Sequence, residues 1–246
     1  QVRFFIGDVR DQERLKRAFS GVDYVIHAAA MKHVHIAEYN PDECIKTNIG
    51  GADNVIKASL ESHVERVVAL STDKACAPIN VYGLSKSIAE HIVQRSECRV
   101  PVVGVRYGNV LNSSGSIIPI FQGQSVNSKN DFLTVTDVNM TRFIISLDDS
   151  VKLIEDAIDF AEAGEIFIPV VPAMKIYDLA SLFSRKCKKS IQIVGSRPGE
   201  KIHESLFSGI ERPCIYKKLV ENRERYVLSV NICNSTVQDI PLEYSS

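Results

Sequence analysis

Short apolar runs alternate with longer amphipathic stretches through most of the chain. Short β-branched and apolar runs predict buried strands, whereas apolar residues that recur at helical spacing predict helices. The expected strands cover residues 2–6, 24–27, 67–70, 100–105 and 164–168, and the expected helices cover residues 12–19, 41–62, 81–95 and 147–163. Because strands and helices alternate, we expect an α/β fold built on a doubly wound parallel sheet.

The pattern loosens after Val110. It then predicts small strands over residues 132–135 and 191–194 and a helix over residues 176–188, which we interpret as a small lobe. We therefore expect residues 1–112 and 147–170 to form the main domain, and residues 113–146 and 171–246 to form the lobe.

Two helix starts carry capping residues. Asp11 precedes the helix expected at 12–19, where its carboxylate would accept from a free backbone N–H. Asn40 precedes Pro41, and Glu43 completes a capping-box pattern. We expect both caps to form.

Composition narrows the functional class. The chain has 246 residues, of which 45% are hydrophobic and 24% charged, and its formal net charge is −1. These values are ordinary for a soluble globular protein and indicate no nucleic-acid or membrane surface. No apolar run is long enough to cross a bilayer, and no signal peptide begins at Gln1. The six cysteines include no C-x-x-C pair and the histidines lack ligand spacing, so we expect a cytoplasmic protein with free thiols and no metal site.

The densest group of reactive side chains lies in residues 70–86, LSTDKACAPINVYGLSK. Tyr82 and Lys86 are four residues apart, which places both side chains on one face of a helix. An ammonium beside a phenol favours the phenolate, so we expect the pKa of Tyr82 to fall from about 10 towards neutrality. Such a tyrosine takes a proton from a sugar or alcohol hydroxyl while a hydride leaves the same carbon. A lone Tyr-x-x-x-Lys pair also arises by chance on a plain helix face, so the context decides.

The context is the carboxyl end of the strand expected at 67–70, the edge where open parallel sheets bind ligands. There, Thr72 is placed to orient a substrate hydroxyl, and Asp73 with Lys74 forms a second acid/base pair. An oxidation needs one such pair, so a second indicates additional chemistry. The small residues Ala28–Ala30 end another strand, where they allow either a flat ligand to approach or a tightly packed strand end.

Taken together, these residues resemble the extended short-chain dehydrogenase/reductases that act on nucleotide sugars. The chain is most similar to the inverting UDP-N-acetylglucosamine 4,6-dehydratases of pseudaminic-acid and surface-polysaccharide biosynthesis, from about Val2 to about Val230. The motifs that carry the resemblance are GDVRD (7–11), HAAA (27–30), AEYNP (37–41), KTN (46–48), STDKA (71–75), NVYGLSK (80–86), RYGNV (106–110), MTRF (140–143), GEIFIP (164–169) and RPGEKIHE (197–204).

The resemblance implies a Rossmann domain that binds NADP or NAD. Asp8 and Val9 would hold the adenine, Asn48 would stand behind the dinucleotide, and Lys86 would also bond the nicotinamide ribose. The full set of implied cofactor-binding residues is Asp8, Val9, Ala28, Ala29, Ala30, Lys32, Asn48, Ser71, Tyr82, Lys86, Tyr107 and Gly108.

The resemblance also implies a UDP-sugar site. Guanidinium forks bind diphosphate oxygens in pairs, which suits Arg142 and Arg197 to this role. The implied substrate-binding residues are Lys32, Asn109, Thr134, Thr136, Met140, Arg142, Arg197 and Glu200. The substrate would be UDP-N-acetylglucosamine, and we expect the intact protein to be a homo-oligomer.

The implied reaction uses five catalytic residues, Thr72, Asp73, Lys74, Tyr82 and Lys86. Tyr82 would take the C4 hydroxyl proton as C4 gives a hydride to the cofactor. Lys74 would then remove the C5 proton while Asp73 protonates the departing C6 hydroxyl, and reprotonation from the other face would invert C5. A lysine base needs a lowered pKa, which we expect from desolvation beside Lys86.

Several alternatives remain open. Tyr82 argues against the membrane-anchored retaining dehydratases, which resemble this chain but have Met at that position. A UDP-sugar C4-epimerase would not need Asp73–Lys74, and a non-catalytic nucleotide-binding protein would not need the catalytic set. The family's glycine-rich loop would precede Gln1, so the chain is expected to be an inactive fragment in which the strand at 2–6 lacks a neighbour and NAD versus NADP is undecided.

Overall fold

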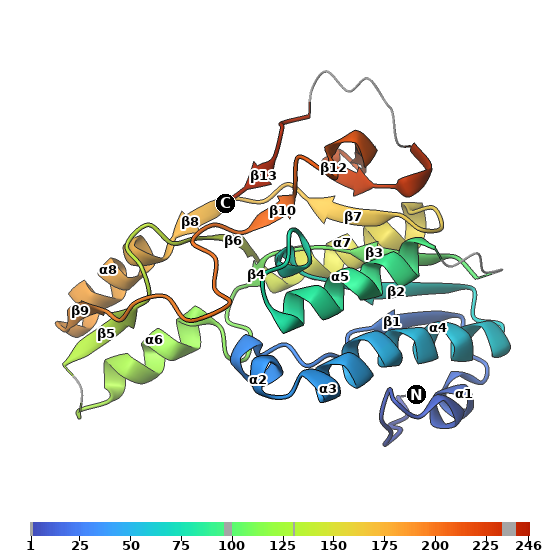
Figure 1. The fold of residues 1–246 in the computed structure, drawn as a ribbon, viewed down its shortest axis with the longest axis horizontal. Helices are drawn as coiled ribbons and strands as arrows, with labels where there is room; N and C mark the ends of the chain where they lie inside the picture. Colours follow the sequence, from blue (N-terminus) through green and yellow to red (C-terminus); the bar gives the residue numbers. More distant parts are fainter. Residues whose placement is uncertain (1, 96–99, 130, 233–239) are drawn as a thin grey trace.

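A six-stranded sheet runs through the middle of the molecule (Figure 1). The computed structural model describes residues 2–95, 100–129, 131–232 and 240–246. The strand order is β1 (Tyr24–His27), β2 (Arg66–Leu70), β3 (Val102–Val105), β7 (Ile166–Pro169), β12 (Arg223–Leu228) and β11 (Ile215–Val220). The first four strands are parallel, and the β11–β12 hairpin joins β7 in antiparallel pairing.

Helices cover both faces of this sheet (Figure 1). Val67 packs on one face with residues of α4 (Gly51–Glu61) and α5 (Val81–Gln94). The next residue, Val68, faces the other way and packs with α7 (Leu147–Phe160), as expected because successive strand side chains alternate between faces. The prediction of a doubly wound parallel sheet is therefore confirmed.

A separate layer of small elements surrounds a second core. Its buried centre contains Phe121, Leu133 and Met140. It is built from α6 (Ile117–Val126), α8 (Ile176–Cys187), and β5 (Phe132–Val135), which pairs with β9 (Ser190–Ile193). Between this layer and the main sheet lie β4 (Asn109–Val110), β6 (Thr141–Ile145) and β8 (Ala173–Lys175), and β10 (Ser205–Phe207) pairs with β13 (Tyr244–Ser245).

The strand predicted at residues 2–6 is wrong. This segment has no regular structure, and Phe4 and Ile6 are each 93% exposed. A strand needs a partner for its backbone N–H and C=O groups, and within the described residues β1 pairs only with β2. The sheet also differs from expectation at its other end, because β11 and β12 lie in the range given to the lobe but extend the main sheet. The division into two domains otherwise stays a prediction.

The two predicted caps have different outcomes. Asp11 caps α1 (Gln12–Phe19) by accepting from the Arg14 N–H. Asn40 does not cap its helix, because its side-chain amide donates to the carbonyl of Ile36 in the preceding helix α2 (Val34–Tyr39). The helix predicted at 41–62 is α3 (Pro41–Cys44), a π-helical turn η1 (Ile45–Gly50) and α4 in succession.

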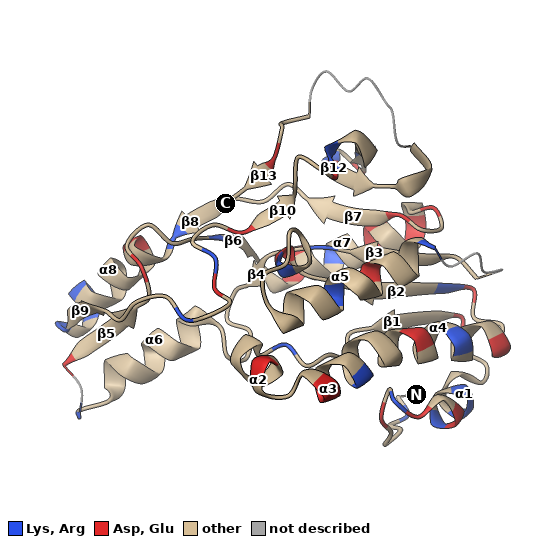
Figure 2. Ribbon diagram, in the orientation of Figure 1, with Lys and Arg blue, Asp and Glu red and all other residues tan. Residues whose placement is uncertain are grey.

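The distribution of charged residues and the state of the cysteines complete the description of the fold. Acidic and basic residues are interspersed along the chain (Figure 2). Cys44, Cys76 and Cys187 are free thiols as expected, whereas Cys214 is disulfide-bonded, which the scattered spacing did not indicate. Cys98 and Cys233 lie outside the described residues. No helix in the described part of the chain is long and apolar enough to cross a membrane.

Candidate active site

Four of the five predicted catalytic side chains meet at the carboxyl end of β2. Thr72 follows the strand and leads into the 3-10 turn η2 (Asp73–Ala75). Its hydroxyl donates to Asp73 Oδ1 at 3.0 Å and shares a hydrogen bond with the hydroxyl of Tyr82. Lys74 Nζ lies 2.9 Å from the same Asp73 oxygen. The structure thus brings Thr72, Asp73, Lys74 and Tyr82 together.

Helix α5 approaches this turn closely. Asn80 caps the helix by accepting from the Gly83 N–H at 2.7 Å. A Cβ on Gly83 would lie 2.4 Å from the carbonyl oxygen of Lys74, far inside van der Waals contact. Glycine at this position therefore lets α5 place Tyr82 against η2.

The expected pairing of Tyr82 with Lys86 is wrong. Lys86 Nζ donates to the carbonyl of Leu70 at 2.5 Å, and burial lowers the pKa of Lys86 to about 8. Burial raises the pKa of Tyr82 to about 12 instead of lowering it, because the phenolate would be desolvated. The charge of Lys74 and the hydrogen bond from Thr72 both oppose this rise in the pKa of Tyr82.

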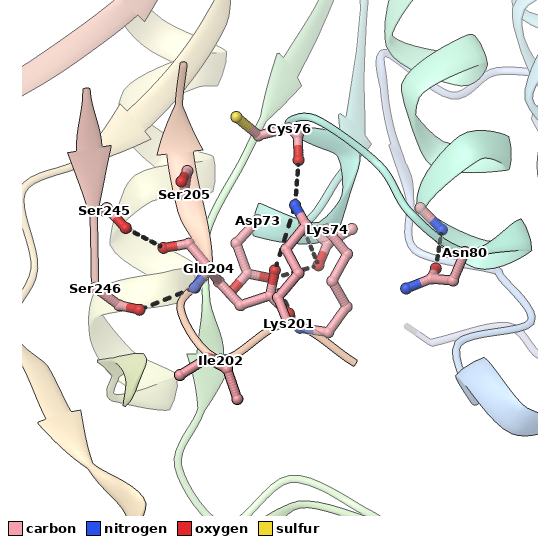
Figure 3. A network of polar contacts seen from close by, with 12 residues as sticks. Asp73, Lys74, Cys76, Asn80, Lys201, Ile202, Glu204, Ser205, Ser245 and Ser246 are labelled. Carbon is pink, nitrogen blue, oxygen red and sulfur yellow. Dashed lines mark hydrogen bonds and ion pairs between the residues drawn. The ribbon is translucent and has the colours of Figure 1, made fainter. Parts of the chain in front are cut away.

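The expected lowering of the pKa of Lys74 is also wrong. Burial alone would lower it, but the carboxylates of Asp73 and Glu204 together outweigh burial and raise the pKa of Lys74. Glu204 Oε1 lies 3.5 Å from Lys74 Nζ, on a residue that is 2% exposed (Figure 3). Lys74 is therefore an ammonium held between two carboxylates.

Glu204 comes from the RPGEKIHE segment, which docks on η2 and on the start of α5. Asn80 Nδ2 donates to the Gly199 carbonyl at 2.7 Å. Lys201 Nζ donates to the Cys76 carbonyl at 2.8 Å, which joins residues 125 positions apart (Figure 3). No role was predicted for Lys201 or Glu204, because nothing local in the sequence indicates that the STDKA and RPGEKIHE motifs meet.

The predicted cofactor side is organised by Asn48. Asn48 lies in the π-helical turn η1, a feature frequent at functional sites. Its side-chain oxygen accepts from the Met31 N–H at 2.8 Å, and its amide donates to the Met31 carbonyl and to Ser85 Oγ. Asn48 thus holds the segment that follows Ala28–Ala30 at the end of β1, and its place behind the dinucleotide stays a prediction. Nearby His27 is buried, which lowers its pKa to about 4 and keeps it neutral.

Other residues of the cofactor set have structural partners. Asp8 pairs with Arg10, whose hydrogen bonds lower the pKa of Asp8 to about 2. Val9 packs against Gly51 of α4. A Cβ on Gly108 would lie 2.5 Å from Phe143 Cβ, and the carbonyl of Tyr107 accepts from the Asp73 N–H. By contrast, Ser71 Oγ is buried at the end of β2 with no hydrogen-bond partner, so its hydrogen-bonding capacity is unused.

The predicted substrate residues are spread over two regions. Arg142 on β6 lies near Lys74, where its charge opposes the rise of the lysine pKa, and its guanidinium donates to the carbonyls of Lys201 and Ile202. The exposed Arg197 and the half-buried Glu200 contact each other through the Arg197 N–H, which donates to a Glu200 carboxylate oxygen at 3.3 Å. The remaining members have these positions: Lys32 donates to the Ser114 carbonyl, Asn109 lies in β4, Thr134 in β5 accepts from Gln124, Thr136 follows β5, and Met140 is buried in the lobe core. Their binding roles stay predictions.

Known proteins with similar sequences bear the resemblance out. A UDP-N-acetylglucosamine 4,6-dehydratase (inverting) from Campylobacter jejuni is 49% identical over 223 residues, which cover 88% of this chain and 65% of that protein. A UDP-glucose 4-epimerase from Rickettsia felis is 43% identical, covering 86% of this chain and 63% of that protein. The chain thus spans slightly less than two thirds of the length of these relatives.

Solved structures agree in fold. The Bacillus thuringiensis protein Pen superposes with a TM-score of 0.89 at 33% identity, over 99% of this chain and 76% of that one. DesIV, a dTDP-glucose 4,6-dehydratase from Streptomyces venezuelae solved with NAD, superposes with a TM-score of 0.72 at 23% identity, over 80% of this chain and 68% of that one. The family model described as polysaccharide biosynthesis protein matches residues 1–220. With its parallel sheet and its STDKA and RPGEKIHE segments in contact, this chain belongs to that polysaccharide biosynthesis family.

Proposed function

We propose that this chain carries the active site of a UDP-N-acetylglucosamine 4,6-dehydratase that inverts C5. The observation that carries the proposal is the 2.9 Å contact between Lys74 Nζ and Asp73 Oδ1, hydrogen-bonded through Thr72 to the buried Tyr82. The name of the Campylobacter jejuni relative supports the same activity. The product would be a 4-keto-6-deoxy sugar for surface-polysaccharide synthesis.

A nicotinamide cofactor, NADP or NAD, fits the residues at the end of β2. The unpartnered hydroxyl of Ser71 and the ammonium of Lys86 offer a hydrogen-bonding group and a charge there, and Ala28–Ala30 leave the end of β1 free of large side chains. When bound, the cofactor would supply the acceptor for the C4 hydride and the donor that reduces C6.

Tyr82 is the base for the oxidation. Its phenol must lose a proton although burial raises its pKa to about 12, so it depends on nearby positive charge. Lys74 supplies part of that charge, and Thr72 stabilises the phenolate by a hydrogen bond. Oxidation at C4 then acidifies the C5 proton for the next step.

Asp73 and Lys74 perform the elimination as a pair. At rest they are a carboxylate and an ammonium, and transfer of one proton across 2.9 Å gives a carboxylic acid and an amine. The Lys74 amine then takes the C5 proton, while the Asp73 acid protonates the C6 hydroxyl, which leaves as water. The step returns both groups to their resting charges, and a proton from solvent then reaches C5 on its other face, which inverts that centre and completes the product.

An epimerase is the second candidate, since the Rickettsia felis relative bears that name. Epimerisation at C4 oxidises and reduces one carbon and eliminates nothing, so it gives the buried Asp73–Lys74 pair no task. We therefore rank it below the dehydratase.

The test is direct. The full-length protein, incubated with UDP-N-acetylglucosamine in deuterated water, should form a 4-keto-6-deoxy product with deuterium at C5 and no net cofactor consumption. Nuclear magnetic resonance of the product distinguishes the candidates. A simple C4 epimer, or a product with only hydrogen at C5, would rule out the proposed mechanism.

A further inference from the structure

Glu204 is a buried carboxylate that the mechanism above does not use. It is 2% exposed, and its Oε1 lies 3.5 Å from Lys74 Nζ. Its other oxygen, Oε2, is buried without a hydrogen-bond partner and lies 3.8 Å from Lys201 Nζ. A buried charge is costly unless it is paired, so the position of Glu204 requires an explanation.

The backbone holds Glu204 firmly in this place. Its N–H donates to Ser246 Oγ at 3.0 Å (Figure 3). Its carbonyl accepts from the Ser246 N–H at 2.9 Å. Two residues earlier along the segment, Arg142 donates to the carbonyl of Ile202. Because the segment is anchored at Ile202 and at Glu204 itself, its carboxylate is directed at Lys74 by the fold.

We propose that Glu204 is a positioning residue, which holds the Lys74 ammonium opposite Asp73 and controls the charge of that amine during dehydration. The inference rests on the proposed function and adds a residue to it. Asp73 lies 2.9 Å from Lys74 Nζ and Glu204 lies 3.5 Å from it, so the ammonium is flanked by one carboxylate from each motif. Asp73 exchanges a proton with Lys74, and Glu204 keeps the amine within reach and favours its charged form.

The groups that face Lys74 determine the direction in which its pKa changes when the Glu204 charge is lost. Asp73 and Glu204 favour the ammonium, whereas Arg142 opposes it. The Tyr82 phenol also feels the Lys74 charge, and Lys201 partly neutralises Glu204. Loss of the Glu204 charge must therefore lower the pKa of Lys74 and enlarge its neutral fraction at a given pH.

The test is competitive acylation of lysines by acetic anhydride at pH 8, followed by peptide mass spectrometry, because only a neutral amine reacts. An opposite charge at this range shifts a pKa by about 1–3 units, so Glu204→Gln should raise the acylation rate of Lys74 by at least about tenfold. The exposed Lys57 provides an internal reference. Glu243→Gln is the matched control, because Glu243 is an exposed carboxylate that accepts from the neighbouring Ser205 hydroxyl, and it should leave Lys74 unchanged.

Two further variants keep the test decisive. Glu204→Asp retains the charge and should label Lys74 close to the wild-type rate, so equal increases in both Glu204 variants would overturn charge control. If Glu204→Gln fails to fold, Lys201→Met replaces it. That variant removes the Lys201 charge that partly neutralises Glu204, so Glu204 should stabilise the Lys74 ammonium more strongly and slow its labelling. An unchanged rate would overturn the proposal.

The kinetic readout concerns the pH profile of C5 deuterium exchange in the full-length protein. Exchange requires the neutral amine, so its rate rises with pH through the pKa of Lys74. In Glu204→Gln the midpoint should move to lower pH by at least about one unit. An unshifted midpoint would refute the role of Glu204 in dehydration, whereas a wild-type protein that labels as expected but makes no dehydrated product would refute the proposed function alone.

Discussion

At the scale of single residues, burial overrides the electrostatics that spacing suggests. Tyr82 and Lys86 are on the same helix, yet Lys86 binds the Leu70 carbonyl and the pKa of Tyr82 is raised to about 12. Lys74, not Lys86, is the ammonium that acts on the phenol. Charge in this site is therefore distributed by contacts from several elements, and single substitutions should separate the chemical steps.

Asp73→Asn should separate oxidation from elimination. Oxidation at C4 needs Tyr82 and the cofactor, so reduced-cofactor absorbance should still appear. Water loss should slow by about 10²–10⁴-fold, because the acid of the elimination is gone. Rapid-quench analysis of the product measures this step. Asp53→Asn, in a surface pair with Lys57, is the control. A parental rate of water loss in Asp73→Asn would contradict the elimination role of Asp73 and favour the epimerase candidate.

At the scale of elements, the site depends on how closely α5 packs on η2. Tyr82 and Gly83 lie in the first turn of α5, and the Lys74 carbonyl lies directly over Gly83. An added methyl group there has no free space, because the nearest atom is backbone. Tyr82 and the Asp73–Lys74 pair are thus held in register because position 83 has no side chain.

Gly83→Ala should destabilise the protein although alanine favours helices. The intrinsic gain is about 1 kcal/mol, whereas overpacking against backbone costs typically about 1–3 kcal/mol, so a net loss of stability is expected together with loss of turnover. Gly123→Ala in α6 is the matched control, because a Cβ there meets nothing within 4 Å. Urea unfolding of both variants measures the difference. A Gly83→Ala protein as stable and active as the parent would show that α5 has room to shift.

At the scale of the whole molecule, Arg106 connects the sheet, the catalytic helix and the C-terminal segment. Its guanidinium, 1% exposed, donates to both carboxylate oxygens of Glu90 on α5. It also donates to Glu211 at 2.8 Å and to the Leu206 carbonyl at 2.9 Å. Glu90 lies one turn beyond Lys86 on the same helix, so this network holds the catalytic helix against the segment that contributes Glu204.

Arg106→Met should destabilise the fold by about 3–5 kcal/mol, because Glu90 would become a buried and uncompensated charge. The free energy of unfolding in guanidinium chloride measures this loss. Lys57→Met provides the comparison, since it breaks an exposed pair with Asp53 and should cost less than about 1 kcal/mol. Equal losses in the two variants would mean that the buried network adds nothing to stability.

The sequence by itself determined the order of strands and helices and the positions of the catalytic motifs. These features depend on periodicity and on local caps such as Asp11, which neighbouring residues along the chain decide. Only the tertiary structure decided which charges meet. It brought Glu204 to Lys74, raised rather than lowered the pKa values of Lys74 and Tyr82, and left residues 2–6 without a partner strand. The physical reason is that pairing, burial and protonation depend on distances between residues far apart in the chain, about which a linear pattern carries no information.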